Sequence, residues 1–235
     1  MRLINQKYKA VIFDLFGTLV DIYYQPDYYS VLREMMSILK TPHDDFVKLW
    51  RSTADQRVTG LFRTLEENLE YICRELNVPV NSSQIKLAKW VRFDYVALAL
   101  TPREGAVEVL SHLKSDGYKI GLVSNCSAEP PVIWQNTLFA PFFDVTVFSS
   151  TAGIQKPDPR IYLMAAEQLK VKPESCLYIG DGDSHELTGA TSVGMHPVLI
   201  RAAHEDSAIA LRSNPEIESW RGPVITSLKE VLTLL

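Results

Sequence analysis

The chain has 235 residues, of which 46% are hydrophobic, and its formal net charge at neutral pH is −4. This length is enough for one large hydrophobic core together with a small second lobe. The slightly acidic charge, with arginine and lysine scattered along the chain, gives no general attraction to nucleic acid or to an anionic membrane surface.

Short apolar runs that end in polar or small residues predict the strands of a sheet. Between the later runs, apolar residues recur at helical spacing, in Glu104–Asp116 and in Asp158–Val171. Strands that alternate with helices favour parallel βαβ units, and therefore a doubly wound, mainly parallel α/β sheet. The predicted strands are Ala10–Phe13, Ile120–Val123, Val145–Phe148, Cys176–Ile179 and Pro197–Ile200, followed by a short apolar piece at Pro223–Ile225 and an amphipathic tail at Ser227–Leu235.

The stretch between the first two predicted strands has no convincing strand and carries only helical patterns. Helix-breaking residues interrupt these patterns at Pro42, Gly60 and residues 78–81. We therefore predict two domains: an α/β core of residues 1–20 and 101–235, and a small all-helical cap of residues 21–100. The insert leaves from the carboxyl end of the first strand, so the cap is expected to lie over the strand ends. The first helix after it is expected to begin at Thr101 or Arg103.

Arginines and tyrosines are frequent in the predicted cap. By default, its arginines are expected to form a solvated face, from which one can reach a substrate carboxylate or phosphate. The tyrosine pairs Tyr23-Tyr24 and Tyr28-Tyr29 follow soon after the first strand, so one or two of these rings are expected to line the substrate entrance. The cap arginines are Arg33, Arg51, Arg57, Arg63 and Arg92.

Cysteine usage and hydropathy bear on the cellular compartment. The three cysteines, Cys73, Cys126 and Cys176, lie far apart and form no CxxC pair. This spacing predicts neither a zinc site nor a disulfide framework, and it suits a reducing, cytoplasmic compartment. No signal peptide or transmembrane segment is predicted. No specific protein partner is indicated.

Polar side chains follow the predicted strands at the points where the strands end. They are Asp14 with Gly17-Thr18, Ser124-Asn125, Lys156-Pro157, and the run from Gly180-Asp181 to Glu186. Because the carboxyl ends of parallel strands meet at one edge of a sheet, these groups are expected to converge. Carboxylates, a hydroxyl, a carboxamide and an ammonium group in one crevice suit a phosphate group and a hard cation such as Mg²⁺.

In their order along the chain, these motifs resemble the four motifs of the haloacid dehalogenase-like hydrolase superfamily. The motifs are Asp14-Leu15-Phe16-Gly17-Thr18, Ser124-Asn125, Lys156-Pro157 and Gly180-Asp181 to Glu186. The resemblance covers the whole core, which is Rossmann-like in that family, and includes a helical cap after the first strand. It implies a hydrolase, and we favour a Mg²⁺-dependent phosphatase that acts on a small phosphorylated metabolite through an aspartyl-phosphate intermediate.

The resemblance also implies roles for individual residues. Asp14 is the implied nucleophile, and Ser124 and Lys156 are the implied catalytic groups that hold the transferring group. The residues implied in substrate or phosphate binding are Gly17, Thr18, Ser124, Asn125 and Lys156. The groups implied in metal binding are the side chains of Asp14, Asp181 and Asp183 and the backbone carbonyl of Phe16. Glu186 is either a further ligand or an acid in the first turn of the next helix, and His185 is expected to be a surface or packing residue.

Phe16 departs from the phosphatase pattern, which usually has an aspartate two residues after the nucleophile. That aspartate is a general acid and base, and losing such a group typically costs on the order of 10²–10⁴ in rate. Three interpretations stay open: a phosphatase that tolerates the loss, a metal-independent 2-haloacid dehalogenase-like hydrolase, or a degenerate member that binds without turnover. Dehalogenase relatives carry an aromatic residue at this position.

The fourth motif favours the first of these interpretations. Dehalogenase relatives resemble Ser-Ser-Asn-x-x-Asp there, whereas this chain has Asp181-Gly182-Asp183-Ser184-His185-Glu186. Several carboxylates beside an ionised Asp14 would repel one another and raise their pKa values. A bound divalent cation removes this conflict, so the acidic run indicates a metal-dependent site.

Overall fold

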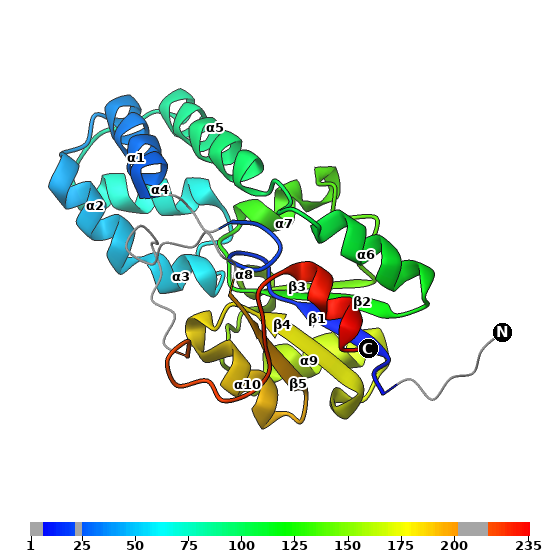
Figure 1. Ribbon diagram of the computed structural model, residues 1–235. Coiled ribbons are helices and arrows are strands. Elements are labelled where there is room, and N and C mark those ends of the chain that lie inside the picture. Colours follow the sequence, from blue (N-terminus) through cyan, green and yellow to red (C-terminus); the bar gives the residue numbers. More distant parts are fainter. Residues whose placement is uncertain (1–6, 22–24, 202–215) are drawn as a thin grey trace.

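The computed structural model describes residues 7–21, 25–201 and 216–235. In these residues, parallel strands form one six-stranded sheet in the order β3-β2-β1-β4-β5-β6 (Figure 1). The strands are β1 (Ala10–Phe13), β2 (Lys119–Ser124), β3 (Val145–Phe148), β4 (Cys176–Gly180), β5 (His196–Ile200) and β6 (Val224–Ile225). The predicted strands are therefore confirmed to within one or two residues at their ends.

Strand β1 lies at the centre of the sheet and is buried on both faces. Successive side chains of a strand point to opposite faces, and here Val11 and Phe13 join one hydrophobic cluster while Ala10 and Ile12 join the other. A strand buried on both faces reads as a continuous apolar run. This is why Ala10–Phe13 contains no polar residue before Asp14.

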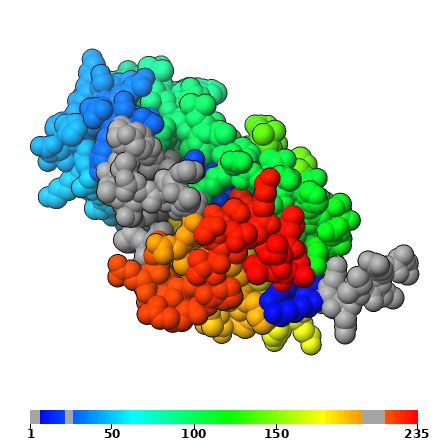
Figure 2. All heavy atoms as spheres, in the orientation of Figure 1, coloured from blue at the N-terminus to red at the C-terminus, as the bar shows by residue number. Residues whose placement is uncertain are grey.

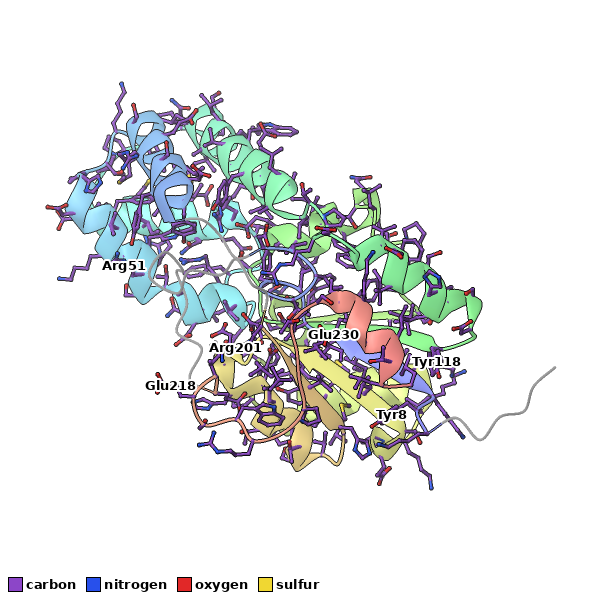
Figure 3. All side chains as sticks on the ribbon, in the orientation of Figure 1. Tyr8, Arg51, Tyr118, Arg201, Glu218 and Glu230 are labelled. Carbon is purple, nitrogen blue, oxygen red and sulfur yellow. The ribbon has the colours of Figure 1, made fainter. Side chains whose placement is uncertain are left out.

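Helices cover both faces of the sheet, which confirms the predicted α/β class. Helix α6 (Ala106–Ser115) and the C-terminal 3₁₀ helix η4 (Leu228–Thr233) pack on the face of Val11 and Phe13. Helices α9 (Pro159–Leu169) and α10 (Glu186–Ser192) pack on the opposite face. Glu230, labelled in Figure 3, lies on η4 and receives a hydrogen bond from the backbone N–H of Ser227. The remaining short helices are α7 (Glu129–Ile133), η1 (Trp134–Asn136), α8 (Ser149–Ala152), η2 (Pro173–Ser175) and η3 (Asp183–His185).

The expected start of the helix after the cap, at Thr101 or Arg103, is wrong. Helix α6 begins at Ala106, and Pro102 instead forms an isolated antiparallel bridge with Val20. A proline disfavours the helical conformation in the residue before it, which keeps Thr101 outside a helix. The segment therefore continues as extended chain beside the loop that follows β1.

The segment between β1 and β2 is helical in its described residues. Its helices are α1 (Gln25–Leu39), α2 (His43–Ser52), α3 (Ala54–Val58), α4 (Leu65–Glu75) and α5 (Ser82–Ala99). They share a hydrophobic cluster that is separate from the two clusters of the sheet. Figures 1 and 2 show this group as a lobe beside the core. The division into a core of residues 1–20 and 101–235 and a cap of residues 21–100 stays a prediction, which the separate cluster supports.

Sequence signals explain where the helices of this lobe begin. Asn81 and Gln84 form a capping box at the start of α5, in which each side chain accepts a hydrogen bond from the backbone N–H of the other. The hydroxyl of Thr64 accepts the N–H of Glu67 at the start of α4. Such caps satisfy N–H groups that a helix leaves without partners in its first turn. In the described part of the chain, no helix combines the length and the apolar character needed to cross a membrane.

Candidate functional site

The sheet changes direction at β1, because the chain adds β2 and β3 on one side of it and β4, β5 and β6 on the other. Ligands of open α/β sheets bind at such a switch point, outside the carboxyl ends of the strands. Three of the predicted groups lie on loops or strand ends at this place. Asp14 follows β1, Ser124 ends β2, and Asp181 follows β4.

Lys156 is the centre of a buried network at the switch point. Its ammonium nitrogen Nζ lies 2.5 Å from Oδ1 of Asp14 and 2.5 Å from Oε2 of Glu186. The hydroxyl of Tyr178 donates to the same Oε2 atom at 2.8 Å. Each of these side chains is buried. The network links the ends of β1 and β4 to the loop that precedes α9.

Asn125 fixes the backbone of Lys156. The N–H of Lys156 donates to Oδ1 of Asn125 at 2.8 Å, and Nδ2 of Asn125 donates to the Lys156 carbonyl at 3.2 Å. The carboxamide therefore uses one donor and one acceptor on the backbone of a single residue. Ser124 and Asn125 were both predicted at the end of β2. Ser124 is the last residue of the strand, and Asn125 follows it and orients Lys156.

The pKa values of Lys156 and Glu186 reflect this burial and charge. Burial alone would lower the pKa of Lys156, but the carboxylates of Asp14 and Glu186 outweigh it and hold the pKa above its usual value. Burial raises the pKa of Glu186 well above its usual range; Lys156 opposes this rise, and the nearby Asp14 and Asp181 add to it. The lysine is therefore protonated at neutral pH, and a further positive charge beside Glu186 would favour its ionised form.

Three buried carboxylates meet beside this lysine. One oxygen from each of Asp14, Asp181 and Glu186 lies within 4.8 Å of the others. With all three ionised, Lys156 is the one cation that the described residues place in this network, and it leaves two of the three negative charges unbalanced. Oxygen ligands of this number and charge fit Mg²⁺, which keeps waters at its other positions. Of the predicted metal ligands, Asp183 is not part of this cluster, whereas Glu186 is.

Two glycines allow these carboxylates to lie against the backbone. A Cβ atom on Gly17, whose φ is +88°, would lie 2.0 Å from Oδ2 of Asp181. A Cβ atom on Gly180 would lie 2.1 Å from Oε1 of Glu186. Both distances are far below any real contact, so every other residue type would displace the carboxylate. Gly17 therefore positions an acid of the cluster.

Three buried oxygen atoms at the strand ends have no hydrogen-bond partner in the described residues. They are Oδ2 of Asp14, Oγ1 of Thr18 and Oγ of Ser124. Buried polar atoms are normally satisfied, so a carboxylate and two hydroxyls left over at one place fit a polar ligand. The backbone N–H groups of Gly17 and Thr18, by contrast, donate within their own loop, to the carbonyls of Val20 and Leu15.

Several residues that contact the site were not predicted, because they lie outside the four sequence motifs. Tyr178 and Tyr162 were not predicted, yet their hydroxyls donate to the side chain and to the backbone carbonyl of Glu186. Glu216 was also missed; its buried carboxylate accepts the N–H groups of Leu187 and Thr188 at 2.8 and 2.9 Å. An acid favours the positive end of a helix, so Glu216 fixes the start of α10, where Glu186 lies. Predicting these contacts requires the strand register and the chain path after β5.

A cavity of about 500 Å³ lies between the helical lobe and the loops that follow β1 and β2. It is lined from the core by Phe16 and Asn125 and from the lobe by aromatic and arginine side chains. Tyr28 and Tyr29 line it, while Tyr23 and Tyr24 lie outside the described residues, and a substrate entrance at these rings stays a prediction.

The expectation that the cap arginines form a solvated face is wrong for two of them. Arg57 and Arg92 are 8% and 4% exposed and line the cavity. Arg33, Arg51 and Arg63 are exposed, and Figure 3 labels Arg51 at the edge of the lobe. Helical periodicity places residues on a face of one helix, but packing between helices decides which arginines become buried. His185 is exposed as expected, and Cys126 is buried beside the cavity.

Comparison with known proteins identifies the family of the chain. The family model of haloacid dehalogenase-like hydrolases matches residues 8–194. The chain is 27% identical to a glyceraldehyde 3-phosphate phosphatase of Pyrococcus furiosus over 98% of its own length and 94% of that protein. It is 25% identical to the (S)-2-haloacid dehalogenase H-109 of Pseudomonas putida, over 80% of this chain and 84% of that protein.

Other matches show the fold or cover a part of the relative. A solved 2-haloacid dehalogenase from Pseudomonas syringae pv. Tomato DC3000 superposes with a TM-score of 0.69, at 18% identity over 97% of each chain. The rhythmically expressed gene 2 protein of Drosophila melanogaster is 36% identical over 113 residues, and the match spans 42% of that protein and 45% of this chain.

Proposed function

Since the chain belongs to the haloacid dehalogenase-like hydrolases, we propose that it is a Mg²⁺-dependent phosphatase that acts on a small phosphorylated metabolite. One observation carries the proposal: the carboxylates of Asp14, Asp181 and Glu186 converge beside a single ammonium group. A divalent cation balances the two remaining negative charges. The relative named a glyceraldehyde 3-phosphate phosphatase supports the same chemistry.

The side chains of Asp14, Asp181 and Glu186 and the backbone carbonyl of Phe16 would hold the cation, and Asp183 would support it from outside the cluster. The backbone N–H of Asp183 donates to Oδ1 of Asp181 at 3.0 Å, which orients that carboxylate. When bound, Mg²⁺ neutralises phosphate oxygens and lowers the repulsion between substrate and carboxylates.

Asp14 is the nucleophile in this proposal. Its Oδ1 atom is bound by Lys156, while Oδ2 has no partner in the described residues and is available to attack phosphorus. The protonated Lys156 offsets charge on the transferring group, and the hydroxyls of Ser124 and Thr18 donate to its oxygens. A water then hydrolyses the aspartyl phosphate. Asn125 keeps Lys156 in place, and Gly17 makes room for Asp181.

Phe16 limits which substrates react well. Its side chain cannot protonate a leaving alkoxide, so the proposed enzyme favours leaving groups that need little protonation, such as sugar-1-phosphates or phosphoanhydrides. Closure of the helical lobe over the site excludes bulk water and selects the substrate. Cys73, Cys126 and Cys176 are buried and form no disulfide, which supports a reducing, cytoplasmic compartment.

A metal-independent dehalogenase is the second candidate. Phe16 favours it, because a halide leaves without a proton, and the chain has a haloacid dehalogenase among its relatives. The acidic cluster opposes it, since a metal-free site would need to hold three carboxylates around one lysine.

One panel of assays decides between the two. The purified protein is offered phosphate esters, a sugar-1-phosphate and 2-haloacids, each with Mg²⁺ or with a chelator, and phosphate or halide release is measured. We expect phosphate release that requires Mg²⁺, and we expect Asp14→Asn to abolish it. Halide release in the presence of chelator, or full phosphatase activity of Asp14→Asn, would contradict the proposal. Binding of Mg²⁺ without any turnover would indicate a degenerate member of the family.

A further inference from the structure

We infer that Arg57 binds a carboxylate of the substrate, so that the substrate is a small phosphomonoester with a carboxylate on its carbon chain. This inference rests on the proposed phosphatase function and specifies its substrate class. Arg57 lies on α3 and lines the same cavity as Phe16, which is two residues from the proposed nucleophile.

The guanidinium group of Arg57 is buried but has only neutral partners. Its Nη1 atom donates to the hydroxyl of Thr53 at 2.7 Å and to Oδ1 of Asn68 at 3.1 Å. Its central carbon lies 3.9 Å from the centre of the Trp50 ring. In the described part of the chain, no carboxylate lies within ion-pair distance of it. Buried charges are normally paired, but the described residues supply no counter-charge to this cation at the cavity wall.

The buried acid Glu129 does not supply that counter-charge, because it is paired with Arg92. Its Oε1 atom accepts a hydrogen bond from Nε of Arg92 at 3.1 Å, and both side chains are buried. Glu129 and Arg92 therefore neutralise each other across the contact between α7 and α5. Of the two buried arginines that line the cavity, Arg92 is paired with Glu129, whereas Arg57 has no acidic partner in the described residues.

Arg57 is charged and held in place at physiological pH. Burial lowers its pKa to about 10, and the positive charge of Arg92 contributes to this decrease, while Tyr28 and Glu129 oppose it. Stacking on Trp50 and the two hydrogen bonds at Nη1 restrict the planar fork before any ligand arrives. A restricted arginine fork matches the geometry of a carboxylate and loses little entropy on binding.

The size and lining of the cavity define the rest of the ligand. A volume of about 500 Å³ with Tyr28, Tyr29, Leu32 and Trp50 in its wall fits a short carbon chain between two charged ends. The positive charge of the buried Arg57 matches the one negative charge of a carboxylate. A second phosphate group would bring excess negative charge to the same place.

Paired phosphonates test the inference without requiring turnover. Phosphonoacetate is compared with ethylphosphonate, and 3-phosphonopropanoate with propylphosphonate, by calorimetric titration of the full chain in the presence of Mg²⁺. Charged hydrogen bonds of this kind contribute enough that at least one carboxylate-bearing ligand is expected to bind roughly 10–100-fold more tightly than its alkyl partner. Equal affinities within both pairs would contradict the inference, and tighter binding of a bisphosphonate of similar length would contradict the choice of a carboxylate.

Three variants locate this preference. Arg57→Gln is expected to abolish it, and Arg33→Gln, which removes an exposed charge of the same lobe away from the cavity, is expected to retain it. Asn68→Asp places a carboxylate of nearly the same shape beside Nη1 of Arg57, so it should raise the melting temperature and reduce the carboxylate preference together. If Arg57 has a purely structural role, Asn68→Asp should raise the melting temperature without reducing the carboxylate preference. If Arg57→Gln does not fold, Asn68→Asp still tests the inference, because it leaves Arg57 in place and supplies a competing carboxylate.

Turnover separates failure of this inference from failure of the proposed function. If carboxymethyl phosphate and ethyl phosphate are hydrolysed with equal kcat/KM, the phosphatase function stands and the inference fails. If no phosphate ester is hydrolysed and none of the phosphonates binds, the phosphatase function fails. Binding of 2-chloropropanoate that depends on Arg57 would then show that the carboxylate contact belongs to a dehalogenase instead.

Discussion

The backbone of Gly17 lies directly against the carboxylate of Asp181, with room for a hydrogen but not for a methyl group. A Cβ atom at Gly17 would lie 2.0 Å from Oδ2 of Asp181. We expect Gly17→Ala to displace this carboxylate and to weaken Mg²⁺-dependent activity by at least roughly tenfold, since one ligand is lost. Gly117→Ala is the matched control, because Gly117 has a similar φ of +82° and no atom within 4 Å of the added carbon.

The control variant isolates backbone strain from displacement of the carboxylate. A left-handed conformation costs a residue with a side chain about 1–2 kcal/mol, and both variants carry this cost. Activity and Mg²⁺ affinity should fall only in Gly17→Ala, while the free energy of unfolding should fall in both. Similar activity losses in the two variants would mean that strain, and not Asp181, is responsible.

Lys156 is expected to stabilise the fold as well as the reaction. Lys156→Met removes the cation shared by Asp14 and Glu186, and removing one partner from a buried ion pair typically costs about 3–5 kcal/mol in the free energy of unfolding. Denaturant titration measures this loss. Lys48→Met, at an exposed position of α2, should change the same quantity by less than about 0.5 kcal/mol. An increase in stability for Lys156→Met would show that the network costs more than it contributes.

Phe16→Asp is expected to restore a general acid beside Asp14. The gain should appear with poor leaving groups such as ethyl phosphate, and should be smaller with an aryl phosphate, whose leaving group needs little protonation. Phe16→Asn is the matched control, because asparagine has nearly the shape of aspartate but no acidic proton, and both variants lose the same buried ring. The measurement is the ratio of kcat/KM values for the two substrates in each variant. If Phe16→Asp and Phe16→Asn have the same ratio, protonation of the leaving group does not limit the enzyme.

Binding of Mg²⁺ should raise stability more at alkaline than at acidic pH. Burial raises the pKa of Glu186 above its usual 4.5, so the folded chain binds this proton more tightly than the unfolded chain. Without a cation, stability should therefore decrease as the pH rises from about 4.5 towards the folded-state pKa. Mg²⁺ competes with the proton for the carboxylates, so its stabilising effect grows over the same range.

The pH dependence of the stabilisation by Mg²⁺ is measured by thermal unfolding with Mg²⁺ and with chelator, at about pH 5 and about pH 8. At roughly one hundred times the dissociation constant, bound Mg²⁺ contributes about 2.7 kcal/mol, which corresponds to a rise in Tm of about 5–10 °C. Glu186→Gln should remove most of the pH dependence. His185→Gln, which changes the exposed residue next to Glu186, should retain it; loss of the pH dependence in that variant would contradict the assignment to Glu186.

The order of strands and helices was predictable because local signals agreed with each other. Apolar runs such as Ala10–Phe13 can be buried on both faces only in a covered parallel sheet, and the connecting helices then require crossovers. The start of α6 was not predictable from Pro102, because the bridge between Pro102 and Val20 depends on how the chain returns from the lobe.

The sequence by itself determined that Asp14, Ser124 and Asp181 lie at the carboxyl ends of neighbouring strands, because parallel strands end at one edge of the sheet. Tertiary structure alone decided that Glu186 lies in the acidic cluster and that Asp183 does not. Two residues so close in sequence differ because the turn after β4 sends one side chain into the core and leaves the other half-buried. Burial of Arg57 was decided in the same way, because packing between helices, rather than periodicity within one helix, determines which charges lose contact with water.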